Sequence, residues 1–135
     1  DEELAGLGVR VSVAGPGDRL PCRISLRDTA TGERALLLNY EHQPAPTPYR
    51  SRHAIFVIDG VEEARLAPGE LPQVFAGRQI ALRAYDRSGC IVGGGLTAGE
   101  EAGALIEELF AGPEAAYLHA HNAAYGCYAA RVDRV

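Results

Sequence analysis

Two histidines near the C-terminus occupy alternate positions of a predicted strand. In the segment 116–121, Tyr117, His119 and His121 fall on one face, and the opposite face is small and apolar. Imidazoles at this spacing could supply two nitrogens to one metal ion or act as an acid/base pair. The same pattern also occurs on solvent-exposed strand faces that have no chemical role.

The register of the next strand, Cys127–Val132, decides which side chains lie beside these histidines. With an odd number of residues outside the ladder, Cys127 and Arg131 share the histidine face; with an even number, Tyr128 and Ala130 do. In the first register, Cys127 beside a histidine could be activated as a thiolate nucleophile. A single cysteine in a strand is also common as a small buried hydrophobic residue.

A second concentration of polar residues flanks a loop with prolines at positions 44, 46 and 48. Prolines at this density cannot donate to a sheet ladder, and they hold the loop in few conformations, which suits the rim of a binding site. The alternative is a solvated connection whose side chains bond only to their own backbone. The candidate residues that flank the loop are Asn39, Tyr40, Glu41, His42, Tyr49, Arg50 and His53.

All four histidines of the chain lie beside this loop or in the C-terminal hairpin, so we expect the two segments to meet in a polar, histidine-lined pocket. There His119 or His121 could serve as acid/base, oriented by Glu41. Arg50 and Arg23 could bind the anionic part of a substrate. The candidate metal ligands are His42, His53, His119 and His121.

The sequence therefore predicts a protein that binds or acts on a small anionic molecule, with a divalent metal as a possible cofactor. The alternative is a non-catalytic protein-interaction module, in which the loop rich in Tyr and Arg contacts a partner and the histidines are structural. A homodimer through a strand edge is a further possibility.

Hydrophobic periodicity predicts an α+β fold. One helix is expected over Ala98–Ala111, with Thr97 and Glu100 as a capping box. We expect a single domain over residues 1–135: a mostly antiparallel, curved β-sheet of about seven strands, packed by this one main helix in the C-terminal half. The predicted strands are Val9–Val13, Cys22–Leu26, Arg34–Tyr40, His53–Ile58, Ile80–Tyr85, Cys90–Val92, Ala116–His121 and Cys127–Val132.

The run Gly93–Ala98 matches the G-x-G-x-x-A form of the dinucleotide-binding fingerprint. That fingerprint requires parallel βαβ units, whereas the preceding strand here is predicted to belong to a hairpin. We therefore expect the glycines to form a flexible turn, with anion capture at the start of the helix as the alternative.

Composition narrows the classes of partner. The 135 residues carry a net charge of −5, which disfavours nucleic-acid binding, and all 13 basic residues are arginine. The apolar runs are too short for a membrane span. Three widely spaced cysteines argue against a disulfide framework and favour a reducing cytoplasm. The chain contains no Met, so we expect its N-terminal start to have been trimmed.

Several ungapped blocks together resemble a small bacterial family catalogued as domain of unknown function 1203. The blocks are Pro21–Leu26, Leu37–Gln43, Pro48–Arg50, His53–Val57, Tyr117–Ala123 and Gly126–Val132. The resemblance runs from about Val9 to the end, and it implies a stand-alone, soluble bacterial protein with no assigned activity. The Gly93–Gly95 triplet departs from the family pattern. The matching polar positions are Arg23, Asn39, Tyr40, Glu41, His42, Tyr49, Arg50, His53, His119, His121, Asn122, Cys127 and Arg131.

Overall fold

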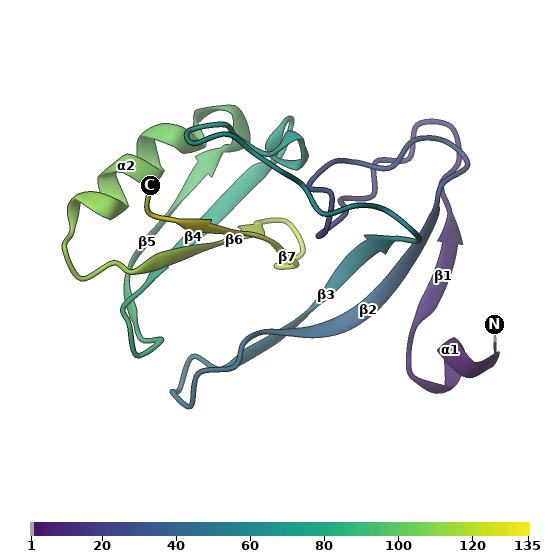
Figure 1. The fold of residues 1–135 in the computed structure, drawn as a ribbon, viewed down its shortest axis with the longest axis horizontal. Helices are drawn as coiled ribbons and strands as arrows, with labels where there is room; N and C mark the ends of the chain where they lie inside the picture. Colours follow the sequence, from purple (N-terminus) through teal and green to yellow (C-terminus); the bar gives the residue numbers. More distant parts are fainter. Residues whose placement is uncertain (1) are drawn as a thin grey trace.

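The computed structural model describes residues 2–135, which form two antiparallel β-sheets and one main helix (Figure 1). The first sheet has the strand order β1-β2-β3 and the second has the order β5-β4-β6-β7. The strands are β1 (Arg10–Val13), β2 (Arg34–Gln43), β3 (Ser51–Ile58), β4 (Gln79–Tyr85), β5 (Ile91–Ala98), β6 (Tyr117–Asn122) and β7 (Tyr128–Asp133). The helices are α1 (Glu2–Gly6), α2 (Ala102–Ala111) and the 3-10 turns η1 (Gln73–Phe75) and η2 (Gly99–Glu101).

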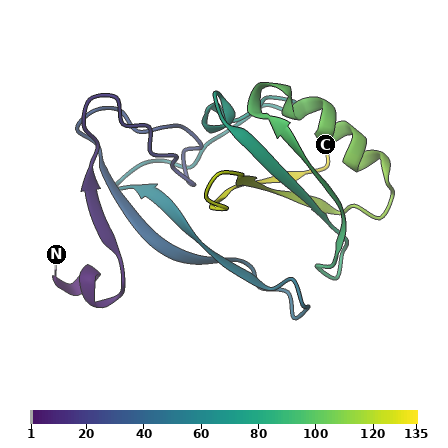
Figure 2. The same ribbon diagram turned by 180° about the vertical axis from the view of Figure 1, so that it is seen from behind.

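The predicted α+β class, with about seven antiparallel strands and a main helix in the C-terminal half, is confirmed. The strands divide into two sheets instead of forming one curved sheet. Both ribbon views show α2 on the face of the four-stranded sheet that is turned away from β2 and β3 (Figures 1 and 2). The histidine-bearing face of that sheet is therefore free of the helix.

The main hydrophobic core lies between α2 and the four-stranded sheet. Leu82 and Ala120 are fully buried on the helix side, where Leu105 and Leu109 of α2 pack against them. Burial of such side chains contributes about 1.5–3 kcal/mol each. This apolar alternation leaves the intervening residues of β4 and β6 to face the other sheet.

The glycine triplet lies inside β5, so the predicted turn is wrong. A Cβ on Gly95 would stand 3.2 Å from the Leu105 side chain, and one on Gly93 would stand 3.3 Å from Leu109. The missing side chains let α2 approach the sheet closely, and this packing keeps the glycines in a strand. Dinucleotide binding by these glycines would require a parallel βαβ unit. The two sheets within residues 2–135 are antiparallel and contain none.

The predicted capping box is also wrong. Thr97 belongs to β5 and its hydroxyl donates to the Ala98 carbonyl, while the Glu100 carboxylate accepts the Gly77 N–H. The strand predicted over Cys22–Leu26 is instead a turn that is stabilised by the Leu26 N–H donating to the Cys22 carbonyl. Leu26 has a φ of 54°, which breaks the period of a strand.

Candidate functional site

The four histidines come from three strands of two sheets and lie together where β2 and β3 face β6. A β-bulge in β2 makes this possible. Tyr40 pairs with His53 and Gln43 pairs with Ser51, so β2 has one extra residue between these two pairs. A bulge turns consecutive residues toward the same side, and His42 and Gln43 are accordingly both buried.

A second bulge decides which side chains of β7 join the histidines. Arg131 pairs with His119 and Tyr128 pairs with His121, with Ala129 as the extra residue between them. The histidine face therefore has Arg131 from one of the two registers predicted from the sequence and Tyr128 from the other. The reason is that the extra residue changes which side chains face inward partway along the hairpin. Cys127 lies just before β7 and outside this pairing.

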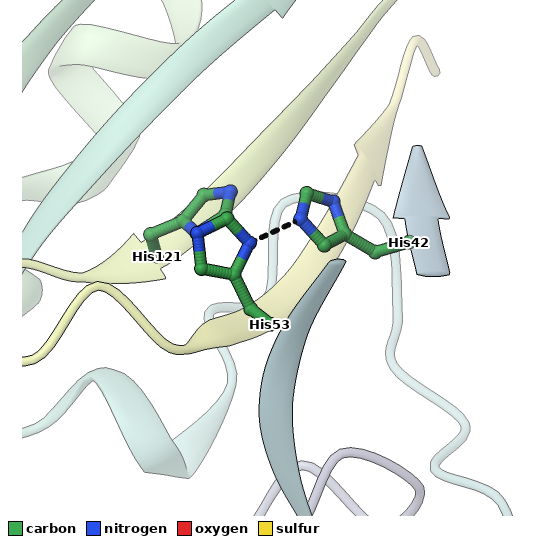
Figure 3. A group of neighbouring side chains, drawn as sticks. All are labelled: His42, His53 and His121. Atoms are coloured by element: carbon green, nitrogen blue, oxygen red, sulfur yellow. Dashed lines mark hydrogen bonds between the residues drawn. The ribbon is translucent and has the colours of Figure 1, made fainter. Parts of the chain in front are cut away.

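Hydrogen bonds connect three of the rings in a chain. His42 Nδ1 lies 3.0 Å from His119 Nδ1, and His42 Nε2 lies 2.6 Å from His53 Nδ1. A neutral imidazole carries one N–H, so His42 donates in one of these contacts and accepts in the other. Figure 3 shows the rings of His42, His53 and His121 turned toward one another.

His121 has its tautomer fixed by the backbone. Its Nδ1 lies 2.9 Å from the Gly126 carbonyl oxygen, which can only accept, so Nδ1 carries the proton. The other nitrogen, Nε2, is then an acceptor. It is buried and has no hydrogen-bond partner among the side-chain and backbone groups of residues 2–135. A buried lone pair without a partner is costly, and it is the arrangement of a metal ligand before the metal binds.

The spacing of the rings fits one ion. One ligand nitrogen from each of His42, His53 and His121 lies within 4.8 Å of the other two. Three nitrogens at tetrahedral angles around zinc are about 3.3 Å apart, given Zn–N bonds of about 2.0–2.1 Å. Binding of one ion would therefore require the rings to rotate, with loss of the His42–His53 hydrogen bond.

Burial keeps the imidazoles neutral. It lowers the pKa of His42 to about 3 and that of His119 to about 3, and the neighbouring imidazole of His121 and the charge of Arg83 add to both shifts. Burial likewise lowers the pKa of His121 to about 4, against the raising effect of its bond to Gly126. Burial and Arg83 also lower the pKa of His53. Neutral imidazole is the form that binds metals, so no proton has to be displaced near pH 7.

Aromatic and cationic side chains enclose the cluster. The Tyr128 ring stacks on His42 with centroids 4.5 Å apart and planes 11° apart. The Arg23 guanidinium lies over the Tyr128 ring, 5.0 Å from its centroid, and donates to the Tyr128 hydroxyl at 3.3 Å. Neither Arg23 nor Arg83 forms an ion pair with a carboxylate within residues 2–135. The surroundings of the cluster therefore carry uncompensated positive charge.

Several residues predicted for the site lie elsewhere. Glu41 pairs with Arg50 at 2.9 Å and with Arg52 at 3.8 Å, so its carboxylate engages guanidinium groups instead of an imidazole. Arg52 also donates to the Asn39 side chain at 2.5 Å. The Tyr49 side chain stands at the surface of the proline loop. The polar groups of Glu41, Arg50 and Asn39 thus contact one another or Arg52 instead of the histidines.

Other predicted residues border the cluster. Tyr40 lies with its ring 6.1 Å from that of Tyr128, and Arg131 lies over the Tyr117 ring at 4.2 Å. Asn122 lines the neighbouring cavity, and its side-chain oxygen is buried without a hydrogen-bond partner among residues 2–135. Cys127 lines a cavity that Tyr128 separates from the histidines.

The histidines pack against one another instead of lining that cavity. His42, His119 and His121 are 6%, 2% and 1% exposed, and His53 is half-buried. The cavity has a volume of about 760 Å³ and is lined in part by Ile55 and Tyr128. The expected polar pocket is therefore a closed histidine cluster beside a more apolar cavity.

Arg83 was not among the site residues predicted from the sequence, and Tyr128 was only one of two alternatives for the position beside the histidines. Arg83 pairs with His119 across the sheet, and its charge contributes to the lowered pKa of all four histidines. A charged residue in the middle of the apolar strand Ile80–Tyr85 was the available signal for it. The position of Tyr128 depends on the β7 bulge, which the sequence does not reveal.

Comparison with protein-family models gives a match over residues 19–134, which is nearly the whole chain, to a family described as protein of unknown function DUF1203. The chain belongs to this family. The searches of curated proteins and of solved structures gave no match. Among residues 2–135, no helix has the length and apolar character needed to cross a bilayer.

Proposed function

We propose that this member of the DUF1203 family binds a divalent transition-metal ion through His42, His53 and His121, and that a small anionic molecule binds next to it. The observation that carries the proposal is His121 Nε2, a buried acceptor without a partner that belongs to a group of three convergent imidazoles. Nitrogen ligands without carboxylates suit zinc or a neighbouring transition metal better than magnesium or calcium.

His119 would orient a ligand instead of binding the metal. If His42 gives its Nε2 lone pair to the ion, its single proton must be on Nδ1, where it can donate to His119 Nδ1 at the observed 3.0 Å. Gly126 does the same for His121 by fixing the proton on Nδ1. Two of the three proposed ligands thus have a second contact that selects the metal-binding tautomer.

Three protein nitrogens leave one position of a tetrahedral ion for water or another ligand. The positive charges of Arg23 and Arg83 favour an anion there, because no carboxylate within residues 2–135 forms an ion pair with them. A bound ion would supply Lewis acidity to that anion or to a water molecule. The protein's own groups would fix the ligands and exclude bulk water.

Titration of the chelator-treated protein with Zn²⁺ in a calorimeter tests the metal site. We expect binding of one ion per chain, and a decrease in affinity of roughly hundredfold or more for His121→Gln, since it loses one ligand. Tyr128→Phe is the matched control because it keeps the ring that stacks on His42, and it should bind Zn²⁺ as the unmodified protein does. Absence of saturable binding, or equal affinity of His121→Gln, would refute the site.

The second candidate is a non-catalytic interaction module with structural histidines. The stacking of the buried Tyr128 on His42 fits histidines with a structural role. The half-exposed Tyr40 and Tyr49 fit a contact surface, since aromatic side chains are enriched at protein interfaces. A folded protein that binds no Zn²⁺, Co²⁺ or Ni²⁺ would support this candidate. A homodimer through a strand edge and a cytoplasmic location stay predictions.

A further inference from the structure

The cavity beside the histidine cluster has the size of a small-molecule site. Its volume of about 760 Å³ falls in the range of about 300–1,000 Å³ that ligand pockets occupy. Its wall is formed by residues 19–21, the middle of β3, residues 77–79, part of β5 and the turn between β6 and β7. Tyr128 contributes to the wall and also stacks on His42, so the cavity and the histidine cluster share one side chain.

Most of the wall is apolar. Leu20, Ile55 and Phe56 contribute side chains to it, and Leu96 and Tyr125 line it as well. Leu96 is 63% exposed and Tyr125 is 91% exposed, so two large hydrophobic side chains remain in contact with water beside the cavity. A flat or branched apolar group in the cavity would remove part of this surface from water, which is favourable.

The charged side chains on the wall are of one sign. Arg19 and Arg78 line the cavity and no Asp or Glu does. Both arginines contact Asp28, at 3.0 Å and 2.7 Å, and this carboxylate is 8% exposed and does not line the cavity. The Glu100 carboxylate, which also acts on Arg19, is likewise absent from the wall. An anion in the cavity would therefore meet guanidinium groups on the wall and no carboxylate there.

One guanidinium nitrogen is available for such an anion. Arg19 uses Nε and Nη2 to donate to Asp28, and Nη2 also donates to the Ala76 carbonyl. Its Nη1 lies 3.1 Å from the point where a side chain on Gly77 would begin. Gly77 lines the cavity, and a side chain there would stand against Nη1.

We propose that this cavity binds a small carboxylate with an aromatic or branched apolar body. The carboxylate would contact Nη1 of Arg19, and the body would pack on Ile55, Phe56 and Leu96. Arg78 would add positive charge without a direct contact, because its Nη1 and Nη2 already donate to the Val74 and Arg19 carbonyls. This inference goes beyond the proposed function, since the carboxylate would lie in the cavity instead of beside Arg23 and Arg83. It does not depend on whether the histidines bind a metal. Apolar area would provide affinity, and the guanidinium groups would provide the preference for an acid.

The test is a titration of chelator-treated, ¹⁵N-labelled protein with 3-phenylpropanoate, followed by NMR. We expect the backbone amides of residues 96 and 123–128 to shift. The neutral analogue 3-phenylpropan-1-ol should bind about tenfold more weakly or worse, as should propanoate, which lacks the apolar body. Equal binding of acid and alcohol, no binding of either, or shifts confined to other parts of the chain would overturn the proposal.

Two substitutions on the same strand separate this cavity from a general surface effect. Leu96→Glu adds a negative charge and removes apolar area at the cavity, and should weaken binding of 3-phenylpropanoate at least tenfold. Val92→Glu is the matched control: Val92 is also exposed on β5 but does not line the cavity. Equal effects of the two would refute the inference. If Leu96→Glu fails to fold, Tyr125→Ala replaces it, because Tyr125 also lines the cavity and lies in an exposed turn. It too should weaken binding of 3-phenylpropanoate more than Val92→Glu does. Zn²⁺ binding is measured separately, so either proposal can fail alone.

Discussion

Acidification from pH 7 to pH 5 should strongly destabilise this protein, because it contains buried imidazoles that stay neutral. The folded-state pKa is about 3 for His42, about 3 for His119 and about 4 for His121, against an unfolded value of 6.5. Below pH 6.5 the unfolded chain therefore binds more protons than the folded chain. The free energy of unfolding must fall as the pH decreases.

The size of the effect follows from linkage. Each of these histidines costs about 1.4 kcal/mol per pH unit below 6.5 until its folded pKa is reached. Between pH 7 and pH 5 this amounts to about 2 kcal/mol per histidine and about 6 kcal/mol for the three. A domain of this size has a total stability of about 5–15 kcal/mol, so the loss is a large fraction of it.

The carboxylates contribute little in this interval. The pKa of Glu33 is lowered to about 2 by its hydrogen bond to Arg27, and its ordinary value is 4.5. The stability that such groups add is present above their unfolded pKa and is lost only as the pH falls below it. Between pH 7 and pH 5 the Glu33 carboxylate stays mostly ionised in both states, so the change in stability comes mainly from the histidines.

Urea denaturation followed by circular dichroism at pH 7, 6 and 5, with a chelator present, measures the effect. The variant His119→Gln removes one neutral imidazole and should decrease the pH slope by about a third. If that variant does not fold, the imidazole carbon shifts of the unmodified protein give the protonation state directly. A free energy of unfolding that is unchanged from pH 7 to pH 5, or protonated imidazoles in the folded protein at pH 5, would refute the reasoning.

Two further predictions concern packing. Gly99→Ala should destabilise the protein by several kcal/mol, since its Cβ would overlap the Phe75 carbonyl oxygen, whereas Gly103→Ala in the open part of α2 should stabilise it by up to about 1 kcal/mol; urea denaturation measures both. A result with the two effects equal would contradict the described contact between η2 and η1. Cys22 is 1% exposed and Cys127 is half-buried, so a thiol reagent such as 5,5′-dithiobis(2-nitrobenzoate) should modify Cys22 much more slowly in the folded protein. Equal rates in the folded protein would show that the Cys22 region opens readily.

The sequence by itself determined the local periodicities and, through them, the fold class. The alternation in Ala116–His121 places both histidines of β6 on one face, because consecutive side chains of a strand point to opposite sides. The grouping of all four histidines in two segments was enough to predict that they meet. That prediction is confirmed by the cluster of His42, His53, His119 and His121.

Tertiary structure decided what surrounds those rings. The bulges in β2 and β7 place His42, Gln43 and Tyr128 inward, and a bulge depends on strand pairing between distant segments instead of on local sequence. The glycines of β5 lie in a strand although glycine is typical of turns. At these positions α2 packs so closely on the sheet that a side chain would crowd the helix. Glu41 forms an ion pair with Arg50 because the folded chain brings their side chains within reach of each other at the surface. The spacing of residues along the chain does not specify such a contact.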